Sequence, residues 1–356
     1  FTRFIMMPEY GIMTPGAGVP VAEPAPAPPY APRVTGNKSC VFSPRRVTLR
    51  VYGSIKSMGR ERPALYNPFG GDAGHADDVA LVGESLAGDA AALERLVRRH
   101  QPWIYNIACR MVFDPDEAQD VTQEILIKLV TRLSTYDPER GAFRTWLYRI
   151  VANHVLTMKK ARREEPFSSL AADGAYFAAL ERIVDRRESS MPENRVLAEE
   201  SRMACITGML LCLDRRSRLV FILGEIFDVS DAVGSGIVDT SRANFRTILS
   251  RSREKVYNFF SRKCGLISEE NPCRCARAAD AQVRLGLIDP ARPMSERTAI
   301  RVSQALGARV KSLEKKYSAK LRDLYREGPF LESPDITGWI RSVLESGEFR
   351  DIFDRN

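Results

Sequence analysis

The chain has 356 residues, of which 44% are apolar and 28% are charged, so it is long enough for about two or three packed domains. That composition excludes a collagen, a mucin-like stalk and a wholly disordered chain. The 53 Lys and Arg residues exceed the 45 Asp and Glu residues and give a modest net charge of +8. No uninterrupted apolar run approaches the ~18 residues of a membrane-spanning helix, so we predict no membrane insertion.

Residues 1–76 are rich in Pro, Gly and Ala and follow neither a helical nor a strand period, so we predict that they are disordered. The apolar run Phe4–Met7 is too short for the core of a signal peptide. Because the sequence starts at Phe1, Met58 is a candidate translation start and the residues before it a candidate upstream-translated segment. The seven Cys do not resemble a secreted disulfide framework, which favours a cytoplasmic protein.

Residues 77–163 contain three apolar stripes at helical spacing, which predict three amphipathic helices packed in a small domain. The stripes begin at Leu93, Ala118 and Phe143. Turn-forming residues separate them. Asp114-Pro115 supplies an N-cap and an early helical Pro, and residues 137–141 form a loop.

Residues 164–195 combine charged runs with Gly, Ser and Pro and predict a linker. Helical periodicity resumes in residues 196–263, with helices expected at 198–213, 216–227, 230–238 and 241–262. Residues 264–356 predict a Cys-containing helical extension, with a basic helix near 301–325 and a last helix opened by Ser333. No strand-like alternation of useful length follows residue 80. The expected fold class is therefore all-α, with two small helical domains joined by a linker.

The second helix of the first domain carries an acidic face. Asp116, Asp120 and Glu124 fall within about 80° of one another around the helix axis, away from the apolar stripe. Such a face is often merely solvated, because acidic side chains are favoured near a helix N-terminus. A metal-dependent catalytic site would need acids that converge from separate elements and usually a His, and the chain has only three His.

The segment after this helix is basic and aromatic. Residues 142–163 contain six basic side chains and no acid, interleaved with Phe143, Trp146 and Tyr148. Basic groups neutralise phosphates and aromatic faces stack on unpaired bases, so the segment suits single-stranded or locally melted nucleic acid. Phe143 and Trp146 are nevertheless better explained as core residues. Tyr136 and the loop at 137–141 are expected to be exposed.

Residues 230–263 predict a short helix, a turn at Asp239-Thr240 and a long helix capped by Ser241. From Ser241 to Lys263 there are seven basic residues and one acidic residue. This is typical of a helix-turn-helix whose second helix enters a DNA major groove with its first residues nearest the bases. Helical hairpins with a basic face are common, so the pattern alone is only moderately specific.

At this point the sequence resembles a known family. The runs Arg98–Pro102, Asp116–Leu126 and Tyr136–Asn153 resemble region 2 of bacterial sigma-70-type factors of the extracytoplasmic-function (ECF) group. Residues 213–263 resemble region 4 of the same family. The first helix of the helix-turn-helix departs from that pattern with Gly234 and Gly236, each of which costs up to about 1 kcal/mol relative to Ala in a helix.

The resemblance implies a sigma factor without catalytic activity that binds core RNA polymerase and directs initiation at promoters. In the family, the acidic helix docks on the clamp coiled coil of the polymerase β′ subunit, which assigns that contact here to Asp116, Asp120, Gln123 and Glu124. The helix at 216–227 would help to meet the β flap. Some members of the family are restrained by an anti-sigma factor, which is a further expected partner.

The resemblance also implies two DNA contacts. The −10 element would meet Tyr136, Arg140, Arg144, Trp146, Arg149, Lys159 and Lys160. The −35 element would meet Ser241, Arg242, Asn244, Arg246 and Arg253, where Arg suits guanine and Asn suits adenine. Two alternatives from other classes stay open: an autonomous helix-turn-helix transcriptional regulator, and a metal-dependent nucleic-acid enzyme built on Asp116–Glu124.

Three Cys crowd the start of the C-terminal extension, at Cys264, Cys273 and Cys275. Three thiolates could hold zinc, but a closed structural site needs four ligands and no His lies nearby in the sequence. A redox-sensitive thiol group is the competing hypothesis, because Arg262, Lys263 and Arg274 would lower the thiol pKa values. The third alternative is a tail whose Cys pack against the second domain. We therefore expect no cofactor, with zinc at these Cys as the exception to test.

Overall fold

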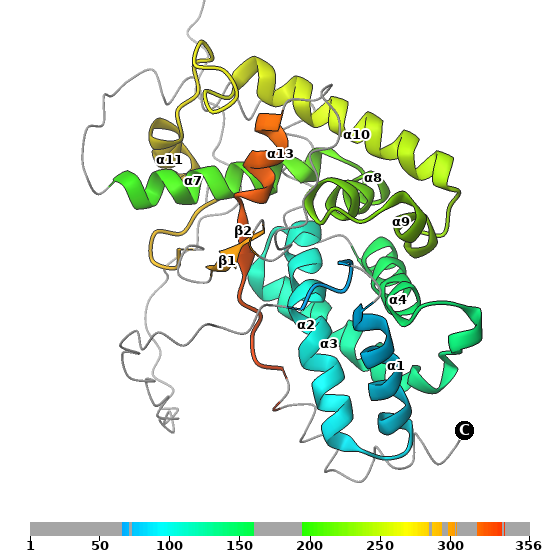
Figure 1. The fold of residues 1–356 in the computed structure, drawn as a ribbon. Coiled ribbons are helices and arrows are strands. Elements are labelled where there is room, and N and C mark those ends of the chain that lie inside the picture. Colours follow the sequence, from blue (N-terminus) through cyan, green and yellow to red (C-terminus); the bar gives the residue numbers. More distant parts are fainter. Residues whose placement is uncertain are drawn as a thin grey trace, which may run out of the picture. The chain divides into compact units, whose positions relative to one another are not determined.

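The computed structural model of the chain describes residues 66–70, 73–159, 194–284, 287–293, 298–302, 304, 319–336 and 338. The predictions for the N-terminal segment and the linker lie almost entirely outside these residues, and Lys160 lies outside them too. Within them the structure is almost wholly helical (Figure 1), which confirms the expected all-α fold. Among the described helices, none combines the length and the apolar character needed to cross a membrane.

The first group of helices covers residues 73–157. Its long second helix, α2 (Ala90–Val112), packs against α1 (Ala73–Leu86) and α3 (Pro115–Thr131), its neighbours in sequence. Asp89 is the N-cap of α2 and Asp114 is the N-cap of α3. Each side-chain carboxylate accepts hydrogen bonds from backbone N–H groups of the first helical turn. The elements are α1 (Ala73–Leu86), α2 (Ala90–Val112), α3 (Pro115–Thr131), η1 (Leu133–Thr135), η2 (Pro138–Arg140) and α4 (Phe143–Thr157).

The second group of helices covers residues 194–263. The helix expected at 216–227 is a short α-helix that continues as a π-helical turn, while the other three expected helices match within a few residues. Asp214, Ser230 and Ser241 cap the starts of their helices with side-chain oxygens. The elements are α7 (Asn194–Gly208), η3 (Met209–Cys212), α8 (Arg215–Phe221), η4 (Ile222–Ile226), α9 (Asp231–Ile237) and α10 (Arg242–Lys263).

In the described part of the C-terminal extension, two short helices, α11 (Cys275–Arg284) and α13 (Ala319–Arg326), are accompanied by a small sheet that the sequence did not predict. Strands β1 (Thr298–Arg301) and β2 (Pro329–Leu331) pair in an antiparallel register with Ile300 opposite Phe330. Helix α11 packs against α7. A basic helix is expected at 301–325, but Arg301 is the last residue of β1. Val302 and Gln304 are helical, helix α13 covers Ala319–Arg326, and most residues between them lie outside the described part of the chain. Residues 332–336 have no regular structure but Gly338 is helical, so the last helix begins later than the predicted start at Ser333.

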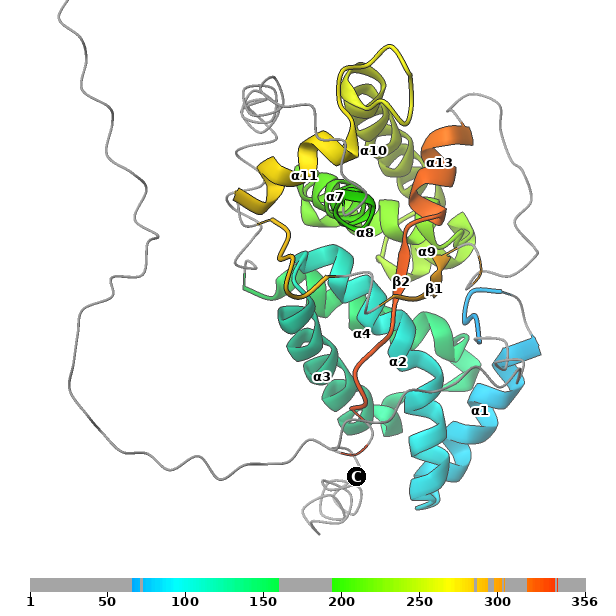
Figure 2. The same cartoon turned by 90° about the vertical axis from the view of Figure 1, so that its left-hand side faces the viewer.

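The extension is built into the core of both helical groups. Strand β2 packs against α2 (Figure 2), and Phe330 lies edge-on to the buried Trp103, with ring centroids 5.0 Å apart. Helix α13 inserts Tyr325 between Phe221 and Phe260, with ring centroids at 5.1 and 6.2 Å. The last described residues are therefore part of the folded body, which the sequence pattern did not indicate.

Candidate polymerase- and DNA-binding surfaces

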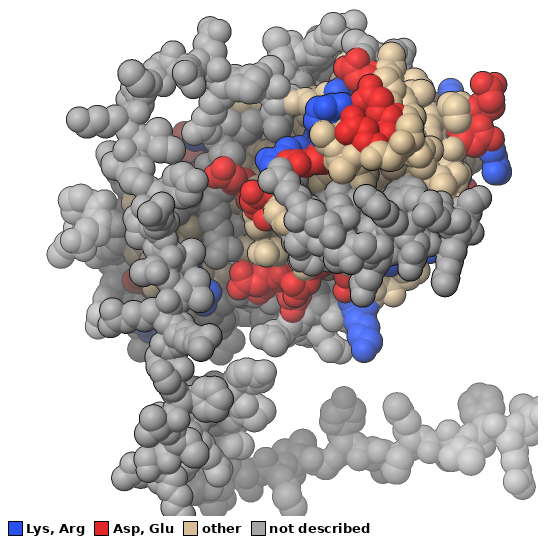
Figure 3. Space-filling model, turned by 90° about the horizontal axis from the view of Figure 1, so that it is seen from below, with Lys and Arg blue, Asp and Glu red and all other residues tan. Residues whose placement is uncertain are grey.

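Helix α3 divides into a buried face and an acidic face, as the sequence predicts. Ala118, Ile125 and Leu129 are fully buried, whereas Asp120 and Glu124 are exposed. Asp116 is exposed as well, and Gln123 is half-buried. These carboxylates lie along one face of one helix and do not converge from separate elements, so the geometry that a metal-dependent enzyme requires is not found here. On the side of the molecule drawn in Figure 3, carboxylates gather in several patches with fewer basic groups between them.

Glu124 also reaches toward α4. Its carboxylate lies 3.5 Å from Nε2 of His154, whose other ring nitrogen lies 2.5 Å from Nζ of Lys128. Burial lowers the pKa of His154, the nearby Lys128 ammonium lowers it further, and Glu124 opposes both effects. His154 is therefore a buried neutral group beneath the acidic face.

The aromatic residues before and within α4 form one cluster, and this corrects the prediction for Tyr136. Its ring is buried, not exposed, with its centroid 5.2 Å from that of Phe143 and 5.7 Å from that of Trp146. Its hydroxyl donates a hydrogen bond to the Gly141 carbonyl at 3.2 Å. The ring turns inward because it covers the apolar start of α4. Phe143 is fully buried, as predicted, and Trp146 is half-buried.

The basic residues expected at the −10 element lie in different environments. Arg140 and the rest of the loop at 137–141 are exposed, as is Lys159, whereas Arg144 is half-buried. Arg149 binds the second helical group. Its Nε and Nη2 atoms donate hydrogen bonds to the Gly236 carbonyl at 3.0 and 2.8 Å. The structure thus holds α4 against α9 through one of the side chains expected to meet DNA.

The helix-turn-helix packs through a glycine. A Cβ atom at Gly234 in α9 would lie 2.5 Å from the ring of Phe245, which is fully buried in α10. Gly234 therefore allows α9 to approach α10, and this close contact explains a residue that helix propensity disfavours. Gly236 is also close to a neighbour, since a Cβ there would lie 3.1 Å from Cγ2 of Thr145.

The first turn of α10 presents an exposed polar group. Ser241, Arg242, Asn244 and Arg246 are all exposed. The hydroxyl of Ser241 accepts a hydrogen bond from the Asn244 backbone N–H at 3.1 Å, so this residue caps the helix. The guanidinium of Arg246 lies 3.4 Å from Asp231, and both side chains are open to solvent.

Arg253, also predicted as a DNA contact, does not belong to that exposed group. Its guanidinium forms an ion pair with Glu225, an acid that is 4% exposed and that also pairs with Arg322 of α13 at 3.3 Å. A buried carboxylate needs such partners, because an uncompensated charge in the core is costly. Glu225 was not among the residues singled out from the sequence. A single acidic residue within the apolar run Leu219–Phe227 could have indicated a buried carboxylate that needs a partner.

The helix expected to meet the polymerase β flap is mostly covered. Residues 218–227 are buried, and the guanidinium of Arg218 donates hydrogen bonds to backbone carbonyls of η3 and of Met111 in α2. Helix α13 packs on the π-helical turn η4. In this structure the predicted flap-binding surface is therefore limited to the exposed start of α8, at Arg216.

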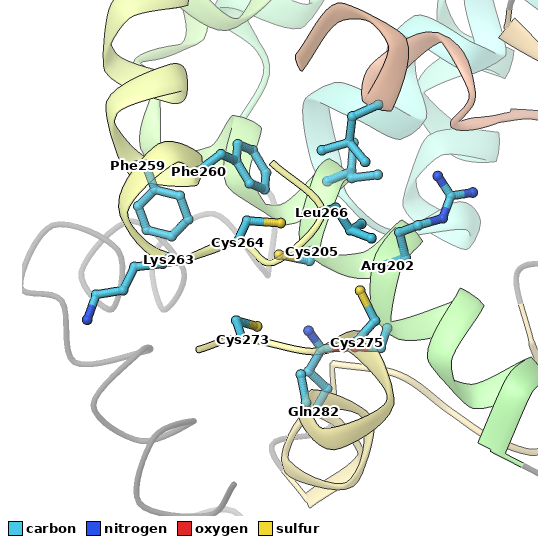
Figure 4. Close-up of a pocket in the computed structure, with 14 residues that line it drawn as sticks. Arg202, Cys205, Phe259, Phe260, Lys263, Cys264, Leu266, Cys273, Cys275 and Gln282 are labelled. Atoms are coloured by element: carbon cyan, nitrogen blue, oxygen red, sulfur yellow. The ribbon is translucent and has the colours of Figure 1, made fainter. Parts of the chain in front are cut away.

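The three Cys of the extension meet a fourth thiol that the sequence reasoning did not connect with them. We call this group the thiol cluster: Cys205 of α7, Cys264, Cys273 and Cys275. All four line one pocket between α7, the end of α10 and α11 (Figure 4). Cys205 lies within α7, far along the chain from the other three Cys, so no sequence motif connects it with them.

Burial outweighs the basic residues that the redox hypothesis expects to lower the thiol pKa values. Burial raises the pKa of Cys273 to about 11 and that of Cys275 to about 12, and neighbouring thiols raise both further. The pKa of Cys264 is raised as well, despite the nearby Arg274 guanidinium. Reactive thiols instead have lowered pKa values.

Comparisons with known proteins identify the family. Residues 96–165 match the family Sigma-70 region 2. The chain is 31% identical to the RNA polymerase sigma-H factor of Pseudomonas aeruginosa over 180 residues, which are 50% of this chain and 91% of that protein. It is also 31% identical to the ECF RNA polymerase sigma-E factor of Escherichia coli K12, over 51% of this chain and 93% of that protein. A solved structure of CnrH in complex with the cytosolic domain of CnrY matches 52% of this chain and 97% of that chain, at 19% identity and a TM-score of 0.35. The chain belongs to the ECF group of sigma-70 family RNA polymerase sigma factors, which direct transcription initiation.

Proposed function

We propose that this sigma factor recognises both promoter elements and docks on core RNA polymerase through separate surfaces of its two helical groups. Residues 77–163 serve as region 2, residues 196–263 as region 4, residues 164–195 as the linker and residues 264–356 as an added extension. The −35 element meets the first turn of α10, the −10 element meets the loop at 137–141 and α4, and the β′ clamp coiled coil meets the acidic face of α3.

The observation that carries the proposal is the first turn of α10. Arg242, Asn244 and Arg246 are exposed together at the start of a long helix whose opposite face is buried through Phe245 and Leu249. A helix-turn-helix reads DNA with the N-terminal residues of its second helix. Arg and Asn can each make paired hydrogen bonds to a purine edge in the major groove.

The acidic face of α3 supports the polymerase contact. Asp116, Asp120 and Glu124 are exposed although the helix that carries them lies in a packed bundle. A row of carboxylates offers a basic partner complementary charge, which speeds association and sets its orientation. The side chain of Glu124 is 63% exposed, so it is available to a partner in spite of its position near His154.

The −10 contact requires a rearrangement. The exposed loop at 137–141 and Lys159 are open to DNA as they stand, but Arg149 donates both of its hydrogen bonds to α9. The buried Tyr136 and the half-buried Trp146 would have to leave their cluster to stack on bases. We propose that α4 separates from α9 when the factor engages promoter DNA.

The experiment that tests this proposal is transcription by purified core polymerase on a set of genomic promoter fragments, with and without this chain. Core polymerase alone starts poorly at promoters, so we expect discrete new transcripts whose upstream sequences share two elements. An autonomous regulator, the alternative, would instead bind duplex sites tightly without polymerase and yield no new transcripts. The cytoplasmic location and an anti-sigma partner remain predictions.

A further inference from the structure

We propose that the thiol cluster is a four-thiolate binding site for a soft divalent cation, with Zn²⁺ as the expected occupant. Four Cys are the complete ligand set of one class of closed zinc site. Three of the four Cys lie close together in the sequence, and the fold brings the fourth, Cys205 of α7, into the same pocket. This site is independent of the DNA and polymerase surfaces.

The lining of the pocket favours a soft metal. Apart from the thiols, it consists of apolar side chains such as Phe260 and Leu266, polar side chains such as Gln282, and the cations Arg202 and Lys263, and it contains no carboxylate (Figure 4). Thiolates without oxygen ligands select Zn²⁺ or Cu⁺ over Mg²⁺ or Ca²⁺.

The turn after Cys264 is closed by backbone hydrogen bonds. The N–H groups of Ile267 and Ser268 both donate to the Cys264 carbonyl at 3.1 Å. Gly265 is required in this turn, since a Cβ there would lie 2.5 Å from the Cys273 carbonyl oxygen. Its N–H donates to that same carbonyl at 3.1 Å, which places the two Cys side by side in a bridge.

The loop between the two Cys is fixed by side-chain hydrogen bonds. The Asn271 amide donates to the carbonyls of Ser261 and Cys264 at 2.9 and 3.0 Å. The Arg274 guanidinium donates to the Glu269 carbonyl at 2.7 Å and to the Cys273 carbonyl at 3.1 Å. These contacts hold Cys264, Cys273 and the start of α11 against the end of α10. The turn that carries two members of the thiol cluster is therefore fixed by hydrogen bonds.

Binding requires the thiols to move inward and to lose protons. Among the described residues, no three His, Cys, Asp or Glu side chains are yet grouped as ligands of one ion. Binding of a cation by these thiols would release their protons. The bound ion would then tie α7, α10 and α11 together.

The test is a titration of the reduced full-length chain with Co²⁺ after removal of metal by a chelator. We expect one Co²⁺ per chain, with the thiolate charge-transfer band and the intense visible bands of tetrahedral coordination, and displacement by Zn²⁺. Replacing any member of the cluster by Ser should weaken binding by at least about tenfold, the smallest loss usual for a group that supports a metal site. Cys109→Ser and Cys212→Ser are matched controls that should bind as the unmodified chain does.

Two results would overturn the proposal. One is a reduced, folded chain that binds neither metal with the expected bands. The other is a Cys205→Ser variant that binds as tightly as the unmodified chain, because the site would then not have its fourth ligand. Circular dichroism of each variant without metal separates loss of binding from loss of folding. Neither result depends on transcription, so failure here leaves the proposed sigma function intact.

Discussion

The side chain of Asn106 in α2 exchanges two hydrogen bonds with the backbone of Leu331 in β2, 225 residues further along the chain. Its amide donates to the Leu331 carbonyl and its carbonyl accepts from the Leu331 N–H, each at 2.9 Å. Asn106 is fully buried, and the neighbouring Arg110 guanidinium donates to the Pro329 carbonyl. An amide in the middle of α2 thus completes the edge of the small sheet and attaches the extension to the first helical group.

Replacing Asn106 by Ala should therefore destabilise the whole folded body. The substitution leaves a buried N–H and a buried carbonyl of Leu331 without their partner, which costs about 1–3 kcal/mol for each unsatisfied group. Chemical denaturation of both proteins would measure the difference in the free energy of unfolding. Asn153→Ala, at an exposed position of α4, is the matched control and should change stability little. Equal stabilities of the two variants would contradict the role of this contact.

Gly234→Ala should destabilise the protein although Ala is the better helix former. The new methyl group would meet the Phe245 ring at 2.5 Å, and overpacking of a core typically costs about 1–3 kcal/mol. Gly83→Ala is the control, since nothing lies within 4 Å of a Cβ at that position of α1. We expect it to be neutral or stabilising by up to about 1 kcal/mol. Thermal melts should show a lower melting temperature for Gly234→Ala and an unchanged or higher melting temperature for Gly83→Ala.

Comparison with the sequence expectations shows which kinds of contact a pattern reveals. The stripe Ala118, Ile125 and Leu129 predicted both the buried face of α3 and its acidic face, because a helix repeats its own geometry along the sequence. Tyr136 and Arg253 were misplaced because their environments depend on partners from other elements, Phe143 and Glu225. Strand β2 and Cys205 were missed for the same reason: their partners lie far away in the sequence.

Arg246→Ala should reduce discrimination among −35 sequences. If the guanidinium reads a base, its removal should cost about 1–3 kcal/mol on the preferred sequence and little on sequences altered at that base. Competition between promoter variants in transcription assays would measure this, with Arg251→Ala, an exposed position of the same helix, as the control. A uniform loss on every sequence would make Arg246 a phosphate contact only.

His154 should make stability depend on pH. Its folded-state pKa lies below the ordinary value of 6.5, because of burial and then of Lys128, with Glu124 opposing them. Between those two pKa values the unfolded chain binds more protons, so the free energy of unfolding falls as the pH drops below about 6.5. Unfolding of the unmodified chain and of a His154→Gln variant at pH 7.5 and 5.5 would test this. The variant should lose less stability on acidification, and an equal or greater loss would contradict the assignment.

The measurement that tests the sigma function most directly is promoter-specific transcription with a variant of the acidic face. Asp120→Lys/Glu124→Lys reverses two exposed charges of α3 and should leave the fold intact. The double variant Glu269→Lys/Glu270→Lys makes the same charge change at an exposed turn of the extension and serves as the control. We expect the unmodified chain and the control to give the same discrete transcripts with core polymerase, and the α3 variant to lose both the transcripts and the complex on a sizing column. Full activity of the α3 variant, or no transcripts from any of the three proteins, would contradict the account.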